Sequence, residues 1–151
     1  MTKEHPHLEE LYVIPLYPHF AMSSYETVVD RVKEVTAKYF PKLKLTFKEP
    51  WYDDDDFIKV LSSSIKENLP EDHHLMFSYH GIPVRHVKKS DCTGLHCYKV
   101  NDCCSVVSEA HKVCYKHQTA LTTKLVAAEL GLEEGTYETS YQSRLGRDPW
   151  I

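Results

Sequence analysis

Cysteine is the residue type whose placement most clearly suggests chemistry in this chain. All five cysteines lie within one short segment, and the rest of the 151 residues contain none. A disulfide framework would spread cysteines along the chain and favour an even number, whereas clustered thiols more often bind metal. The C-x4-C-x5-C-C-x9-C spacing lacks the paired C-x-x-C units of common zinc sites and matches no standard ferredoxin pattern. The candidate metal ligands are Cys92, Cys97, Cys103, Cys104 and Cys114.

A second group of candidate residues follows the predicted strands. Ligands of parallel α/β sheets bind beyond the carboxyl ends of the strands, and this rule selects residues 15–20, 80–83 and 142–144. His80 comes directly after one predicted strand. A neutral imidazole can accept a proton or bind a divalent metal ion, so a cleft-facing His80 could do either. The alternative is an ordinary turn histidine.

The elements that must position these residues follow from hydrophobic periodicity. Ser23 and Glu26 form a capping box for a first helix. The aspartates at 53–56 suit the positive end of a second helix better than a metal site, and a third helix is expected from near Cys104 to Leu130. Strands are predicted at 11–15, 43–47, 75–79 and 136–141.

Alternation of strands and helices predicts an α/β chain. We expect a Rossmann-like parallel sheet with right-handed crossovers and helices on both faces, in three layers. Length predicts one domain over residues 1–151, interrupted by a cysteine-rich insert at about 90–104. Residues 85–102 show no clear period.

Composition excludes several classes of function. The net charge of −4 and the absence of a basic stripe argue against a nucleic-acid partner. No apolar run approaches the roughly 18 residues of a membrane span. The polar N-terminus lacks the apolar core of a signal peptide, so the expected compartment is the cytoplasm.

The strand-end segments also carry a family resemblance. Pro15-Leu16-Tyr17-Pro18, then residues 77–83, then Tyr141-Gln142-Ser143-Arg144 with Pro149-Trp150 resemble, in this order, the signature of ferrochelatases. The resemblance implies a chelatase-type fold and an enzyme of haem biosynthesis that inserts Fe²⁺ into protoporphyrin IX and releases two protons. It assigns the catalytic role and an Fe²⁺ contact to His80, and it implies porphyrin-binding roles for Tyr17, Pro18, Ser78 and Arg144.

The resemblance also bears on the cysteines, because some ferrochelatases carry a 2Fe–2S cluster held by an internal segment similar to this one. Four thiolates suffice for such a cluster, so one of the five cysteines is surplus. Adjacent Cys103 and Cys104 point their side chains apart, which makes one of them the expected spare. Cys114, a few turns into the predicted helix, could instead be a core residue. Zinc with His96 or His111 as substitute ligands is the alternative, and a structural role is expected in either case.

Ferrochelatases are longer than this chain and contain two similar α/β halves around a porphyrin cleft. The resemblance covers the end of the first half and most of the second, without the later acidic motif. It therefore implies a fragment that is inactive alone. The competing hypothesis is a non-catalytic iron–sulfur or zinc module that binds a tetrapyrrole or a partner. Peripheral membrane contact, which the hydrophobic substrate suggests, and the oligomeric state stay open.

Overall fold

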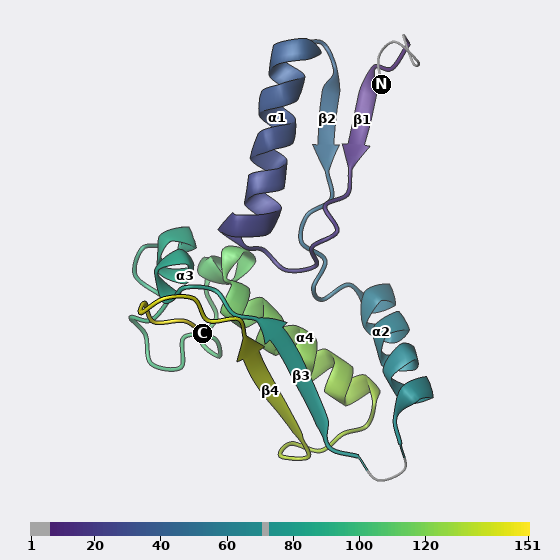
Figure 1. Ribbon diagram of the computed structural model, residues 1–151, viewed down its shortest axis with the longest axis vertical. Helices are drawn as coiled ribbons and strands as arrows, with labels where there is room; N and C mark the ends of the chain where they lie inside the picture. The colour runs from purple at the N-terminus through teal and green to yellow at the C-terminus, as the bar shows by residue number, and fades with distance from the viewer. Residues whose placement is uncertain (1–6, 71–72) are drawn as a thin grey trace. The chain divides into compact units, whose positions relative to one another are not determined.

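The computed structural model describes residues 7–70 and 73–151 and divides the chain into two compact units, Met1–Trp51 and Tyr52–Ile151. Each unit contains one pair of parallel strands connected through helices (Figure 1). The predicted α/β class with parallel strands is confirmed. Within the described residues, the helices are too short or too polar to traverse a lipid bilayer.

The first unit is a strand–helix–strand element. Strands β1 (Glu10–Val13) and β2 (Lys44–Phe47) pair in parallel, and helix α1 (Thr27–Tyr39) connects them. The segment after β1 is held by Trp51, whose backbone N–H donates to the carbonyl of Pro18 at 2.9 Å. The indole Nε1 of Trp51 donates to the carbonyl of Pro15 at 3.4 Å. These bonds fix the backbone on both sides of Leu16 and Tyr17.

The predicted capping box at Ser23 is wrong. A π-helical turn over Met22–Glu26 precedes α1, and no side chain caps it. The N–H of Glu26 instead donates to the carbonyl of Ala21 at 3.2 Å. This wider turn buries Ala21 and Tyr25 together, and that burial outweighs the local preference of a serine for the cap position.

The second unit contains the remaining elements. Helix α2 (Asp55–Asn68) leads to strand β3 (Leu75–His80), helix α3 (Val84–Ser90), a 3₁₀ turn (Glu109–Val113), helix α4 (Tyr115–Glu129) and strand β4 (Tyr137–Gln142). Strands β3 and β4 pair in parallel from Leu75 opposite Tyr137 to His80 opposite Gln142. The connection between them therefore holds the whole cysteine segment.

The interpretation of the aspartates as a helix cap is confirmed. Asp54 is the N-cap of α2, and its Oδ1 accepts hydrogen bonds from the N–H groups of Asp56 at 3.2 Å and Phe57 at 3.3 Å. Asp55 and Asp56 occupy the first turn, where carboxylates interact favourably with the helix dipole.

Helices α2 and α4 and the strand pair share one apolar core around Ile58, Phe77 and Val126. Polar bonds reinforce the contact between α4 and the strands. The hydroxyl of Tyr79 pairs with Thr123 at 2.9 Å, and that of Tyr141 pairs with Thr119 at 2.6 Å. These buried threonines are satisfied by strand tyrosines, so they cost little of the free energy of folding.

The predicted start of the third helix near Cys104 is wrong, because α4 begins at Tyr115. The carbonyls of Cys103 and Cys104 accept hydrogen bonds from histidine side chains, and Asp102 has a positive φ of 48°. Both features are incompatible with a continuous helix. The short helix α3 was not predicted, because its few apolar positions, Val84 and Val87, give no visible period.

Candidate active site and cysteine site

Strand β3 presents Ser78 and His80 on the same face. Phe77 is buried and Tyr79 half-buried against α4, whereas Ser78 and His80 are exposed. Because side chains alternate across a strand, residues two apart share a face. The structure therefore places Ser78 on the same exposed face of β3 as His80.

The turn after His80 requires a glycine. The N–H of Gly81 donates to the carbonyl of Gln142 at 2.7 Å. A Cβ at Gly81 would lie 2.9 Å from the carbonyl oxygens of both Gln142 and Ile151. Residues 149–151 run antiparallel to 82–84, and Pro83 opposes Trp150. The Pro-Trp segment recognised in the sequence thus supports the backbone that follows His80.

Arg144 follows the end of β4. Ser143 has a positive φ of 71°, so the chain leaves the strand direction there. The Arg144 side chain is exposed and makes no ion pair within residues 7–70 and 73–151. Further along the same segment, Asp148 pairs with Arg85 of α3. The porphyrin-binding role of Arg144 stays a prediction.

Tyr17 and Pro18 belong to the first unit, after β1. Tyr17 is 42% exposed, and Pro18 is half-buried. The exposed phenol ring can stack on a flat ligand. The two units are described separately, so the expectation that these residues line one cleft with His80 stays a prediction.

Four of the five cysteines interact with one another. Cys97, Cys103 and Cys114 are buried, and Cys104 is half-buried. The thiols of Cys104 and Cys97 hydrogen-bond to Cys114, which lowers the pKa of Cys114 to about 6. Burial and the neighbouring Cys114 raise the pKa of Cys97 to about 12. Cys92 is exposed and does not take part in this set of contacts.

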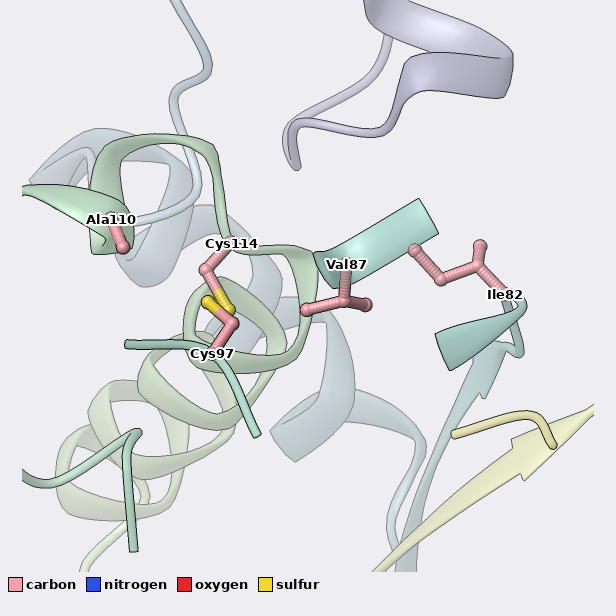
Figure 2. Packing of buried hydrophobic residues seen from close by; sticks show 5 residues of the cluster. All are labelled: Ile82, Val87, Cys97, Ala110 and Cys114. Atoms are coloured by element: carbon pink, nitrogen blue, oxygen red, sulfur yellow. The ribbon is translucent and has the colours of Figure 1, made fainter. Parts of the chain in front are cut away.

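The prediction that Cys114 lies inside a helix is wrong, because it is the N-cap of α4. Cys114 also packs in an apolar cluster with Cys97 and Val87 (Figure 2). A lowered pKa at a helix N-terminus favours the thiolate, which is the form of cysteine that binds metal. Within residues 7–70 and 73–151, no group of three or more metal-binding side chains is arranged to hold an ion as it stands.

A buried carboxylate organises the loop that carries these cysteines. One oxygen of Asp91 accepts hydrogen bonds from the N–H and hydroxyl of Thr93 and from the N–H of Gly94. The other oxygen accepts from the N–H groups of His96 and Cys97, both at 2.8 Å. Burial alone would raise the pKa of Asp91, but the hydrogen bonds from Thr93, Cys97 and His96 outweigh it and hold the pKa below its usual range.

Three histidines surround the adjacent cysteines through backbone contacts. Nε2 of His96 and Nε2 of His111 donate to the carbonyl of Cys103 at 2.6 and 2.9 Å. Nδ1 of His117 donates to the carbonyl of Cys104 at 2.9 Å. The rings of His111 and His117 stack at 3.6 Å. In this arrangement His96 and His111 orient the cysteine backbone.

Sequence reasoning missed two residues that shape the site, Asp91 and Tyr115. The Asp-x-Thr-Gly pattern that begins at Asp91 is a recognisable turn signal. Tyr115 gives no such signal, because its partner, the carbonyl of His80, lies 35 residues away in sequence. Only the folded chain reveals this contact.

The fold and the site define a parallel α/β protein with a histidine at a strand end and a thiol-rich segment in the following crossover. A family model described as Ferrochelatase matches residues 2–151. The chain belongs to the ferrochelatase family, and the family named from the strand-end motifs is confirmed.

Individual relatives agree with this assignment. The chain is 45% identical to a ferrochelatase of Opitutus terrae over 145 aligned residues. The alignment covers 95% of this chain and 42% of the relative. It is 41% identical to a ferrochelatase of Pseudomonas fluorescens over 139 aligned residues. This alignment covers 91% of this chain and 41% of the relative. The chain therefore spans less than half the length of these curated relatives.

Proposed function

We propose that this protein takes part in haem biosynthesis by inserting Fe²⁺ into protoporphyrin IX with release of two protons. The observation that carries the proposal is the family membership together with an exposed His80 at the end of β3. The fixed turn at Gly81 supports it, because a catalytic side chain must be held in a defined position.

In the proposed reaction, the two pyrrole N–H bonds break, Fe²⁺ forms bonds to all four ring nitrogens, and the two protons leave through His80 and water. His80 accepts a pyrrole proton through its unprotonated ring nitrogen, or contacts the entering Fe²⁺. Ser78, on the same strand face, hydrogen-bonds to the imidazole or to the substrate. The iron remains Fe²⁺ throughout, so the balance needs no oxidant or reductant.

The remaining substrate-binding residues would orient the macrocycle. Arg144 pairs with a porphyrin propionate, since guanidinium and carboxylate groups match in geometry. Tyr17 stacks on the ring or bonds to its edge, with Pro18 beside it. These roles concern the whole enzyme and rest on the resemblance of the strand-end motifs.

A porphyrin titration combined with an iron-insertion assay tests the proposal. We expect the protein expressed from its complete gene to quench porphyrin fluorescence on binding and to convert the porphyrin to haem under anaerobic conditions. The same two measurements on the 151-residue chain separate binding from turnover. Binding without insertion by the complete gene product would favour a non-catalytic tetrapyrrole-binding module instead.

We also propose a 2Fe–2S cluster at the cysteine segment. The donor types support it, because the thiols of Cys97 and Cys104 contact Cys114, Cys103 acts electrostatically on Cys97 and Cys104, and such a cluster needs four cysteine ligands. We now assign the surplus thiol to Cys92 rather than to one of the adjacent pair. When bound, the cluster would act as a structural crosslink, because metal insertion requires no electrons.

Two serine variants test this ligand set. Cys92→Ser is expected to leave the visible absorbance of aerobically purified protein unchanged, because Cys92 is exposed and outside the interacting group. Cys97→Ser is expected to abolish that absorbance. Metal and sulfide analysis of both variants gives the stoichiometry. A colourless wild-type protein with one zinc ion would contradict the cluster and favour zinc at the same thiols.

A further inference from the structure

The peptide group between His80 and Gly81 is held at both ends. Its N–H, on Gly81, donates to the carbonyl of Gln142 at 2.7 Å. Its carbonyl, on His80, accepts a hydrogen bond from the hydroxyl of Tyr115 at 2.9 Å. The first of these bonds continues the strand pairing, whereas the second joins the strand end to the first residue of α4. Tyr115 therefore fixes the backbone next to the His80 side chain.

Tyr115 is also the residue directly after Cys114. Cys114 is the N-cap of α4 and the centre of the thiol contacts. The start of the helix is stiff, because the buried amide of Gln118 donates to the carbonyls of His111 and Lys112 at 3.2 and 2.8 Å. A displacement of Cys114 would therefore move Tyr115 with it.

A second physical connection runs through apolar packing. Ile82, Val87, Cys97, Ala110 and Cys114 form one buried cluster, and Tyr115 packs against it. Figure 2 shows the sulfur atoms of Cys97 and Cys114 next to each other and Val87 between them and Ile82. Closely packed side chains transmit small displacements. The residue two positions after His80 thus shares a core with two cysteines.

The direction of the hydrogen bond between Tyr115 and His80 follows from the groups themselves. A backbone carbonyl can only accept, so the Tyr115 hydroxyl is the donor.

We propose that Tyr115 is a positioning residue that makes the placement of His80 depend on whether the cysteine site is loaded. This inference rests on the proposed roles of His80 and the cysteine site. Cys114 and the neighbouring cysteines would hold the bound group, and their movement on loading would shift the start of α4 and with it the Tyr115 hydroxyl. The hydroxyl in turn holds the His80 carbonyl.

The test compares Tyr115→Phe with a matched Tyr141→Phe variant. Tyr141→Phe also removes a hydroxyl that bonds between α4 and the strand pair, but its partner is Thr119. The protein is labelled with ¹³C,¹⁵N-histidine, and the His80 ring signal is assigned by its loss in His80→Ala. Spectra are recorded after iron and sulfide reconstitution, after zinc loading, and after removal of metal by a chelator.

In the wild-type protein and in Tyr141→Phe, we expect the His80 ring signal to shift between the loaded and empty states. In Tyr115→Phe this shift should be lost, while the visible spectrum of the loaded site is retained. If the complete gene product turns over, Tyr115→Phe should lower kcat roughly ten- to hundredfold with little change in KM for porphyrin.

Three results would overturn the inference: a shift retained in Tyr115→Phe, an equal loss in Tyr141→Phe, or no shift in the wild-type protein. Failure of the proposed chelatase function can be distinguished from failure of this inference, because the His80 ring signal is measured without any turnover. A protein that inserts no iron but shows the Tyr115-dependent shift would refute the chelatase proposal and support the coupling.

Discussion

Replacement of His80 with alanine is expected to lower the rate of iron insertion by roughly 10²- to 10⁴-fold, the usual contribution of a positioned acid–base group. The physical reason is the loss of the only proton acceptor that the proposed mechanism uses at the end of β3. Porphyrin affinity should change little. The His80 imidazole is exposed and the apolar core lies on the opposite face of β3, so the substitution should leave the fold around the site intact. The measurement is anaerobic haem formation by the complete gene product.

His74→Ala is the matched control for this prediction. His74 is also an exposed histidine, but it precedes the other end of β3 and lies 3.6 Å from the carboxylate of Glu138. Its replacement should leave the rate of insertion unchanged. Insertion by His80→Ala at the wild-type rate would refute the assignment of His80, whatever the result for the control.

The second large effect is expected at Asp91. Asp91→Ala should lower the free energy of unfolding by about 2–4 kcal/mol, because it leaves buried N–H groups of the cysteine loop without their acceptor. Asp91→Asn should have a smaller effect in the same direction, since an amide lacks the charge and presents a donor to some of these N–H groups. Denaturant unfolding measures the stability, and reaction with a thiol reagent measures exposure of Cys97.

Asp102→Asn is the control within the same loop. Asp102 is exposed, and its positive φ of 48° is a conformation that asparagine also adopts readily. It should unfold as the wild-type protein does. An Asp91→Asn variant with unchanged stability and unchanged Cys97 reactivity would contradict the role of the carboxylate.

The Asp91 contribution should also depend on pH. Because its pKa is lowered in the folded protein, the unfolded chain takes up the proton first as the pH falls. The stabilisation is therefore fully present above about pH 5 and declines through more acidic conditions. The difference in stability between the wild type and Asp91→Asn should shrink over that range.

The sequence determined the features of this protein that depend on local patterns. Alternating and helical periodicity gave the four strands to within a residue or two, since burial of one face imposes the period. Asp54 caps α2 and Gly131 adopts a positive φ of 69° after α4, as their residue types predict. The strand-end motifs around His80 identified the family because they combine order and spacing over the whole chain.

The tertiary structure decided what depends on contacts between distant residues. It placed Cys114 at a helix start instead of inside a helix, because histidine side chains bind the carbonyls of Cys103 and Cys104. It brought the Tyr115 hydroxyl to the carbonyl of His80. Neither contact leaves a local signature, since such bonds form only after the apolar core has brought α4 against the strand pair. The cysteines and the strand end at His80, which the sequence presents as two separate signals, are therefore connected by the Tyr115 hydrogen bond and by one shared apolar cluster.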